Sequence, residues 1–291
     1  KKIDEVIAGA VTTHSRDWNL AREAVLSTTL SPATPGTTLQ MACGTSLQAA
    51  LLLAGRIATG QIDTAIAAGT DTTSDAPLVL QPRFAKRLVK ASQGKTFSAK
   101  LKSFKGMSMR ELAPQAPANG EPRTKLSMGQ HCELMAKEWA ITREEQDQWT
   151  MESHLKAAAA YESGFFDNLL LPYHGVARDN NLRPDSNLEK LSTLKPAFDR
   201  SATGTLTAGN STPLTDGSAA VFMTSEAYAL EHGLEVQAWL TQGRTSAVDF
   251  VGGEGLLIAP TVAVREMLTH SKLTLQDFDY YEIHEAFAAQ V

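Results

Sequence analysis

Apolar runs and helical periods alternate along the first part of the chain and predict strands alternating with helices. Residues 4–11 and 37–43 carry strand formers, and residues 63–69 hold an uninterrupted small and apolar run, as in a sheet covered on both faces. Residues 45–59 have almost no polar side chain, which predicts a helix buried nearly all round. Strand, helix and strand in this order predict a βαβ unit with a right-handed crossover, and with it the α/β class.

Shorter patterns predict the other elements. Helices are expected over residues 18–30, 128–140, 142–164 and 260–270, and strands over residues 219–224, 236–242 and 279–283. Thr142 and Glu145 have the spacing of a capping box, which sets the start of the helix over 142–164. The strand over 219–224 reads as buried, and the strand over 279–283 ends at His284. Pro, Ala and Gly residues in 114–123 indicate a linker.

The composition describes a globular protein of one large or two ordinary domains. The chain has 291 residues, 43% of them hydrophobic and 20% charged. Its apolar stretches are interrupted well before the roughly 20 residues that a membrane span needs, so no span is predicted. Two cysteines, Cys43 and Cys132, make no disulfide framework, which fits a reducing compartment. No spacing of His, Cys or Asp matches a metal site, so no metal is expected. Both ends read as cut, because the sequence begins and stops inside element-like patterns.

One segment departs from the overall net charge of −5. Nine of the 27 basic residues and no acidic one fall within residues 81–110, while the rest of the chain has 18 basic against 32 acidic residues. Bulky apolar residues are spaced among these lysines and arginines. A solvated, mobile loop is the plain interpretation. An anionic membrane surface or an acidic partner subunit are the alternatives, and no motif for nucleic-acid binding accompanies the segment.

Cys43 is the first candidate for chemistry, because it lies where a strand meets the start of a helix. The positive end of a helix favours thiolate, the reactive form, whereas a lone cysteine is also commonly a small buried hydrophobe. From position alone both readings stay open. Residues 204–218 are small, polar and turn-forming, and such a loop either lets a ligand approach the backbone or is an ordinary tight connection. His284 follows a predicted strand end, and His154 reads as a surface or packing residue.

Several separate motifs resemble the thiolase family, acyl-CoA acetyltransferases that cleave or form 3-ketoacyl-CoA. They are the segment around Cys43, Ala67–Asp71, Ser127-Met128-Gly129 with Glu133, Arg143–Asp147, Ser153-His154, Leu194–Phe198, Thr207–Asn210, Thr215–Gly217 and His284–Phe287. The resemblance runs along nearly the whole chain. It implies a thiolase-like fold of two βαβ-rich halves with an inserted loop domain. The implied division is residues 1–78 and 206–235 for the N-terminal half, 79–205 for the loop domain, and 236–291 for an incomplete C-terminal half.

The resemblance also implies roles for particular residues. Cys43 would be the acylated nucleophile, and its backbone N–H would form part of an oxyanion hole. His284 stands where many thiolases have Asn and would polarise the thioester oxygen through a water. The positions expected to contact coenzyme A, which is a substrate and not a resident cofactor, are Ser127, Met128, Arg183, Phe198, Ala208, Gly209, Thr212 and Phe287. Ser127 replaces a His of the family at its position.

The implied activity is thiolytic cleavage of 3-ketoacyl-CoA by CoA in fatty acid β-oxidation, through an acyl-cysteine. The family's His base in a Gly-His-Pro segment and its second cysteine are expected downstream of His284–Phe287, and Cys132 in the loop-domain helix is not that cysteine. His284 and the basic segment look like the β-subunit branch that works with an α subunit. A homodimer or tetramer in the cytoplasm or mitochondrial matrix is expected. The alternatives are a biosynthetic acetoacetyl-CoA thiolase and a non-catalytic CoA-binding or assembly module; a decarboxylative synthase is disfavoured because its His framework is not visible.

Overall fold

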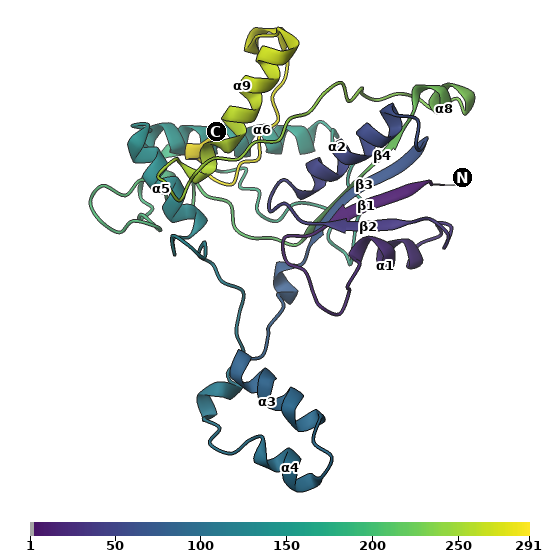
Figure 1. Cartoon of the computed structure of the whole chain (residues 1–291). Helices are drawn as coiled ribbons and strands as arrows, with labels where there is room; N and C mark the ends of the chain where they lie inside the picture. The colour runs from purple at the N-terminus through teal and green to yellow at the C-terminus, as the bar shows by residue number, and fades with distance from the viewer. Residues whose placement is uncertain (1–2) are drawn as a thin grey trace. The chain divides into compact units, whose positions relative to one another are not determined.

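A four-stranded sheet with the strand order β2-β1-β3-β4 organises the first of two compact units. The structure is a computed structural model that describes residues 3–291, so Lys1 and Lys2 lie outside the described residues (Figure 1). The first unit comprises residues 1–117 and 214–241, and the second comprises residues 118–213 and 242–291. The strands are β1 (Glu5–Gly9), β2 (Gly36–Leu39), β3 (Thr64–Asp71) and β4 (Gly217–Thr224). β1 pairs in parallel with β2 and β3, and β4 pairs antiparallel with β3.

Two helices cover opposite faces of this sheet, as the apolar runs predict. Along β1, Val6 and Ala8 pack with α1 (Leu20–Leu26), while Ile7 on the other face packs with α2 (Thr45–Ala58). Side chains alternate between the faces of a strand, so a strand with a helix on each side needs apolar residues at consecutive positions. β2, α2 and β3 therefore form the predicted βαβ unit, with β1 lying between the two parallel strands.

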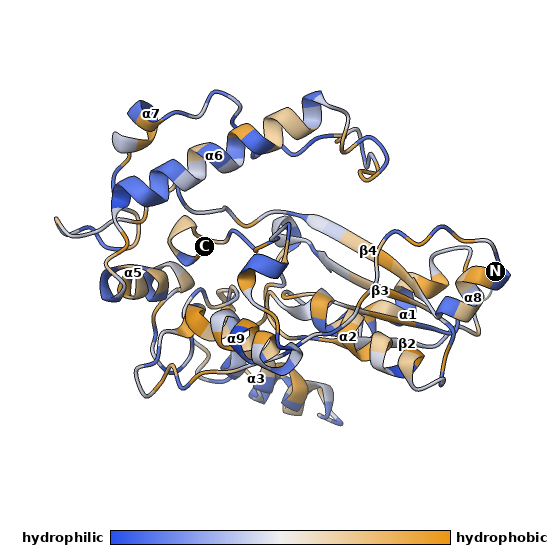
Figure 2. Ribbon diagram, turned by 90° about the horizontal axis from the view of Figure 1, so that it is seen from above, coloured by the Kyte–Doolittle hydropathy of each residue, from blue (hydrophilic) through white to orange (hydrophobic). Residues whose placement is uncertain are grey.

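Two burial predictions are wrong. In α2 only Thr45, Ala49 and Leu53 are buried, and Leu47 is 73% exposed, so the helix is not enclosed all round. In β4 the first six residues are exposed, although Ala219–Phe222 among them are apolar (Figure 2). Both errors have one cause: residue type predicts which face prefers burial, but burial itself requires a second element on that face. Within residues 3–291, α2 is buried along one side only, and the first six residues of β4 are exposed on both faces.

The second unit is mainly helical. Its helices are α5 (Met128–Glu138), α6 (Arg143–Glu162), α7 (Leu188–Ser192) and α9 (Ala259–Ser271), with short 3-10 turns at Leu256–Ile258, Leu275–Asp277 and Ala288–Gln290. The first unit also holds α3 (Pro82–Ser92), α4 (Phe97–Lys102), α8 (Glu226–Glu231) and 3-10 turns at Thr73–Asp75 and Met109–Leu112. The predicted capping box is confirmed, because the Glu145 backbone N–H donates to the Thr142 side chain and the Glu145 carboxylate accepts from the Thr142 N–H.

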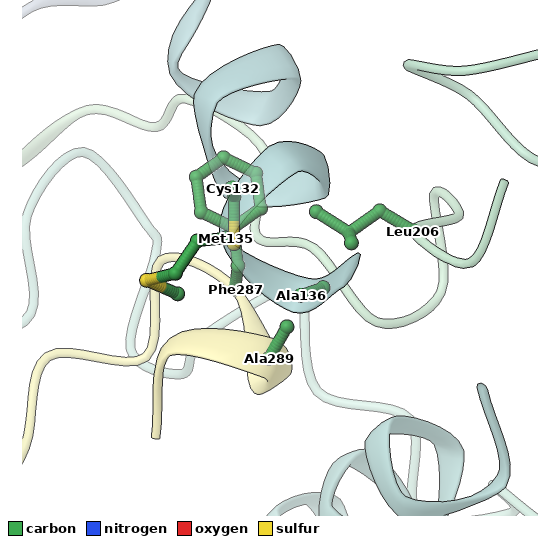
Figure 3. Packing of buried hydrophobic residues seen from close by; sticks show 6 residues of the cluster. All are labelled: Cys132, Met135, Ala136, Leu206, Phe287 and Ala289. Atoms are coloured by element: carbon green, nitrogen blue, oxygen red, sulfur yellow. The ribbon is translucent and has the colours of Figure 1, made fainter. Parts of the chain in front are cut away.

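The core of the second unit joins α5 to the last residues of the chain (Figure 3). Cys132, Met135 and Ala136 of α5 pack with Leu206 and with the C-terminal residues Phe287 and Ala289. Residues 129–136 of α5 are buried at six positions, so the helix lies deep in the unit. This packing fixes the position of the segment that begins at His284.

Two strand predictions in the C-terminal part are wrong. Residues 236–242 and 279–283 are irregular, and His284 therefore does not follow a strand. A strand exists only when its backbone pairs with a neighbour, and sequence alternation cannot supply that partner. The division into halves and an inserted loop domain stays a prediction. No helix within residues 3–291 is long and apolar enough to cross a membrane.

Candidate functional site

Cys43 lies in a tight turn between the carboxyl end of β2 and the start of α2. The preceding residue, Ala42, has a φ of +43°, which L-amino acids rarely adopt, and Gly44 is the N-cap of α2. Thr45 holds this backbone in place: its hydroxyl donates to the Ala42 carbonyl at 2.6 Å and accepts from the Met41 N–H at 2.9 Å. The strained turn is thus fixed by a side chain of the helix that follows it, and it presents Cys43 to solvent.

Two glycines allow α2 to approach the sheet closely at this turn. A Cβ added to Gly9 of β1 would lie 2.0 Å from the Leu39 carbonyl oxygen and 2.5 Å from Cγ2 of Thr45. A Cβ added to Gly69 of β3 would lie 3.0 Å from Cβ of Ser46. Gly9 is the last residue of β1 and Gly69 lies opposite it in β3, so both stand beside the start of α2. The position of Cys43 therefore depends on residues of three strands and not only on its own turn.

The two cysteines differ sharply in environment. Cys43 is exposed, whereas Cys132 is wholly buried in the core of the second unit. Burial, aided by the neighbouring Glu133 carboxylate, raises the pKa of the Cys132 thiol to about 12. A thiol with such a pKa is almost never a thiolate at neutral pH, so Cys132 is a packing residue. Of the two cysteines, Cys43 is the one with the exposure that a nucleophile needs.

A cavity of about 660 Å³ opens in the second unit. Its walls come from α6, from α7 and the residues that follow it, from the loop 208–213 and from the C-terminal segment. Five of the residues predicted to contact coenzyme A line it together: Arg183, Phe198, Ala208, Gly209 and Thr212. A cavity of this size suits an extended small molecule.

Hydrogen bonds from α5 hold the loop that forms one wall of this cavity. The buried Glu133 carboxylate accepts from the Thr205 N–H at 2.7 Å, from the Thr205 hydroxyl at 2.9 Å and from the Leu206 N–H at 3.0 Å. Gln146 of α6 also donates to the Thr205 hydroxyl, at 3.0 Å. Because three donors converge on one carboxylate, the loop enters the cavity wall with a fixed backbone.

A second network continues from α6 to Asn210. Arg143 pairs with Asp147 at 2.7 Å and donates to the carbonyls of Leu191 at 2.5 Å and Leu194 at 3.2 Å. The other oxygen of Asp147 accepts from the Asn210 amide at 3.1 Å. Asn210 in turn accepts from the Thr207 N–H at 2.7 Å. These residues bond inward and support the wall, so their part in the site is to position the loop.

The C-terminal segment is joined to the same loop by backbone pairing. The Thr212 N–H donates to the Ala286 carbonyl, and the Ala288 N–H donates to the Asn210 carbonyl, both at 3.0 Å. Beside this pairing, Glu285 lines the cavity and accepts from Trp149 Nε1 at 2.9 Å and from Ser153 Oγ at 2.5 Å. The carboxylate is thereby held against α6 by residues more than 130 positions away in the sequence.

His154 also lines the cavity, which differs from its reading as a surface or packing residue. Its Nδ1 accepts from the Arg183 backbone N–H at 3.3 Å, so the neutral ring carries its proton on Nε2. Burial lowers the pKa of His154, and the Arg183 cation lowers this pKa further, while Glu285 and Asp179 act in the opposite direction. The imidazole is thus kept neutral beside a group that attracts anions.

The remaining predicted site residues lie outside the lining of this cavity. Ser127 is the N-cap of α5 and forms a capping box with Gln130, and Met128 begins that helix. Phe287 is buried in the core, where its ring packs edge-on against Phe198 with centroids 5.7 Å apart. His284 is exposed and comes directly before Glu285. The roles of all these residues stay predictions.

Sequence reasoning missed Trp149, and it named Ser153 only as part of a family motif, without the hydrogen bonds that both residues donate to Glu285. Trp149 and Ser153 are four positions apart on α6, which places them on one face of the helix. This spacing of four residues is the sequence signal that could have predicted that Trp149 and Ser153 lie side by side. Within residues 3–291 no cluster of three or more His, Cys, Asp or Glu side chains is arranged to hold a metal ion.

Comparison with known proteins gives consistent matches. The thiolase N-terminal domain matches residues 1–227 and the thiolase C-terminal domain matches residues 234–291. The 3-ketoacyl-CoA thiolases of Yersinia enterocolitica and Yersinia pestis are each 40% identical to this chain over 294 residues, covering 99% of this chain and 67% of theirs.

Solved structures agree in fold. The acetyl-CoA acetyltransferase of Bacillus anthracis superposes with a TM-score of 0.81 at 30% identity, covering 99% of this chain and 70% of its own. The Acat5 thiolase from Ascaris suum, solved in complex with coenzyme A, superposes with a TM-score of 0.82 over the same shares of the two chains. At 24% identity this second likeness concerns the fold alone.

Proposed function

The chain belongs to the thiolase family, and from this premise we propose that it is an acetyl-CoA C-acyltransferase with Cys43 as its nucleophile. The observation that carries the proposal is the exposed thiol of Cys43 on a strained turn, held by Thr45 at the start of α2. A fixed and accessible thiol of this kind suits nucleophilic catalysis. The relatives named as 3-ketoacyl-CoA thiolases support 3-ketoacyl-CoA and CoA as the substrates.

The proposed reaction has two half-steps on Cys43. The thiolate attacks the 3-keto carbonyl, and the bond between the second and third acyl carbons breaks. The electron pair of that bond stays with acetyl-CoA, whose α-carbon takes up the proton that the thiol gave up. The shortened acyl group remains on Cys43 as a thioester, and the thiol of a second CoA then takes it and returns a proton to Cys43.

The cavity of the second unit is the proposed site for coenzyme A. Arg183 offers a cationic group for phosphates, and Lys190, which pairs with Asp185 at 2.5 Å, offers a second one. Phe198, Leu191 and Leu194 offer apolar surface for the pantetheine arm. The backbone of Ala208 and Gly209 allows close approach, because no large side chain stands there. Contacts from Ser127, Met128 and Phe287 remain part of the proposal as expected from the family resemblance.

His284 is proposed to polarise the substrate thioester oxygen through a water. A donor that is positioned before negative charge develops on such an oxygen is typically worth about 3 to 4 kcal/mol. His284 follows directly on a backbone segment that is irregular, and the residues just after it are fixed by pairing with 210–212. The backbone that carries His284 is therefore held on its C-terminal side by these hydrogen bonds.

Trapping of the acyl-enzyme tests the assignment of Cys43. After incubation with acetyl-CoA labelled in the acetyl group, the peptide that contains Cys43 should carry the label, and iodoacetamide should react with Cys43 at least about 10-fold faster than with Cys132. Cys43→Ser should abolish the acetyl label, whereas the matched variant Cys132→Ser should keep it. Acetylation that survives in Cys43→Ser, or faster alkylation of Cys132 in native protein, would refute the proposal.

Acetylation of Cys43, together with CoA titration and product analysis, distinguishes the two alternative functions. A non-catalytic CoA-binding module would bind CoA in titration calorimetry but leave Cys43 unacetylated. A biosynthetic acetoacetyl-CoA thiolase would be acetylated as well, and it would form acetoacetyl-CoA from acetyl-CoA without acting on longer 3-ketoacyl chains. Action on longer chains supports the proposed place in fatty acid β-oxidation, in the cytoplasm or the mitochondrial matrix. A homodimer or tetramer is proposed from the family resemblance, and light scattering measures it.

A further inference from the structure

His284 lies between a stretch of backbone without hydrogen bonds and one that is paired. Among the described residues 3–291, no backbone group of residues 279–285 is hydrogen-bonded to another backbone group, and each of these residues is exposed. The first paired backbone group after this stretch is the carbonyl of Ala286, which accepts from the Thr212 N–H. Backbone pairing therefore begins only two residues after His284 and does not include it.

The side chain of Glu285 supplies an attachment directly next to His284. Its Oε1 accepts from Trp149 Nε1 at 2.9 Å, and its Oε2 accepts from Ser153 Oγ at 2.5 Å. Because each oxygen has its own donor, the plane of the carboxylate is fixed as well as its position. Both donors lie on one face of α6, one helical turn apart. Glu285 thus joins the segment to a helix before backbone pairing begins.

The helix that carries these two donors is itself held in place. α6 has 20 residues and begins in a capping box. Its first turn is joined to the loop 204–213 through Asp147, which accepts from the Asn210 amide at 3.1 Å. The Lys156 ammonium lies over the Trp149 ring, 5.5 Å from its centroid. The two donors to Glu285 therefore stand on a fixed element, and contacts outside residues 279–283 hold this element.

Two other roles for Glu285 fit these contacts less well. Glu285 lines the cavity proposed for coenzyme A, and a carboxylate would repel the phosphates of that ligand and not bind them. A general base has to direct an oxygen at the substrate, whereas each oxygen of Glu285 is directed at a donor of α6. What the contacts fix is the backbone next to His284.

We propose that Glu285 is a positioning residue for His284. Hydrogen bonds from Trp149 and Ser153 hold the Glu285 carboxylate, and the carboxylate in turn holds the neighbouring imidazole where it polarises the thioester oxygen of the substrate. The proposal rests on the role of His284 in the proposed function. A catalytic group displaced by about 1 Å loses up to about 100-fold in rate, so a side chain on unpaired backbone needs such a support. The support acts through hydrogen bonds and not through the charge of Glu285.

The rate at which acetyl-CoA acetylates Cys43 in the full chain tests the proposal. Glu285→Ala should lower this rate at saturating acetyl-CoA by at least about 10-fold, while the concentration for half-saturation changes by less than about 3-fold. Glu285→Gln should keep the rate within about 3-fold, because its amide oxygen accepts from Trp149 and its NH₂ group donates to the Ser153 hydroxyl, which also accepts. An equal loss in the two variants would overturn the proposal, since charge and not hydrogen bonding would then matter.

A second substitution shows whether Glu285 acts through His284. His284→Ala should slow acetylation by about 100-fold, and adding Glu285→Ala to it should cost less than about 2-fold more. A merely structural role of Glu285 would slow the reaction equally in both backgrounds, and that result would refute the proposal. Asp279→Ala is the matched control, because it removes an exposed carboxylate from the same segment, and it should leave the rate unchanged.

NMR of the His284 imidazole requires no activity and distinguishes failure of the positioning role from failure of the proposed function. The His284 signals, assigned by their loss in His284→Ala, should shift or broaden when Trp149→Phe and Ser153→Ala are combined, and stay unchanged in Asp279→Ala. If they shift while His284→Ala leaves acetylation unchanged, the catalytic role of His284 is wrong and its positioning by Glu285 is supported. If His284→Ala slows acetylation while the combined variant changes neither the signals nor the rate, the positioning proposal is refuted and the role of His284 stands.

Discussion

Glu133 gives a quantitative test of how the cavity wall is held. Its carboxylate is buried and accepts three hydrogen bonds, two from Thr205 and one from the Leu206 N–H. In Glu133→Gln one carboxylate oxygen becomes an NH₂ group, which donates and cannot accept. If the remaining oxygen keeps both bonds from Thr205, the Leu206 N–H faces another donor in a place without solvent.

The expected cost follows from these contacts. A buried donor left without a partner costs about 1 to 3 kcal/mol, and the two retained bonds are weakened because the acceptor is no longer charged. We therefore expect a loss of about 3 kcal/mol in the free energy of local opening. This corresponds to an increase of about 150-fold in the amide exchange rate of the loop.

Hydrogen exchange of peptides covering residues 204–213 measures the effect directly. Glu138→Gln on the same helix is the matched control, because Glu138 is exposed, and its exchange should stay within about 2-fold of the parent protein. Coenzyme A affinity should fall in Glu133→Gln and not in Glu138→Gln, since the loop lines the cavity. Equal exchange in the two variants would show that Glu133 does not hold the wall.

Two other predictions concern the same unit. The pKa of His154 should rise in Arg183→Gln, measured by NMR titration of the imidazole, because the cation that lowers this pKa is removed; an unchanged or lower pKa would contradict the geometry. Since the pKa of His154 is lowered in the folded protein, the unfolded chain takes up the proton first, and this contribution to stability is full above the ordinary value of 6.5 and declines as pH falls below it. Gly204→Ala should destabilise by about 3 kcal/mol and Gly209→Ala by only about 1 kcal/mol in urea unfolding, because the new Cβ would lie 1.9 Å from a backbone oxygen in the first case and 2.5 Å from a movable Leu194 methyl in the second. The reverse order would refute this argument.

Local signals predicted most of the helices. The capping box of Thr142 and Glu145, the apolar period of residues 45–59 and the run in 63–69 each depend on a few neighbouring residues, and the structure has α6, α2 and β3 there. The wrong predictions are ones whose outcome depended on a distant partner. Residues 236–242 have the alternating pattern of a strand but pair with no other strand among the described residues. The outward face of α2 is apolar, but no other element covers it within residues 3–291.

The candidate site shows the same limit. The family resemblance correctly predicted that Arg183, Phe198 and Gly209 share one site, since all three line the same cavity. It could do so because the resemblance relates each of these positions to a known place in the fold. The hydrogen bond from Trp149 to Glu285 joins residues 136 positions apart, and neither their residue types nor their spacing along the chain predicts it. The sequence likewise indicated a surface or packing residue at His154, because its environment of Arg183 and Glu285 exists only after folding.

The residues of the family motifs have two different structural roles: some support the cavity wall, and others form its surface. Glu133, Asp147 and Asn210 bond inward and hold the loop 204–212 on α5 and α6. Ala208 and Gly209 stand on that loop with almost no side chain, so the supported backbone itself forms the wall. A substitution at a supporting residue such as Glu133 should therefore weaken coenzyme A binding through loop opening, with faster amide hydrogen exchange in residues 204–213. A substitution at Ala208 or Gly209 should change coenzyme A binding while amide hydrogen exchange of the loop stays nearly the same.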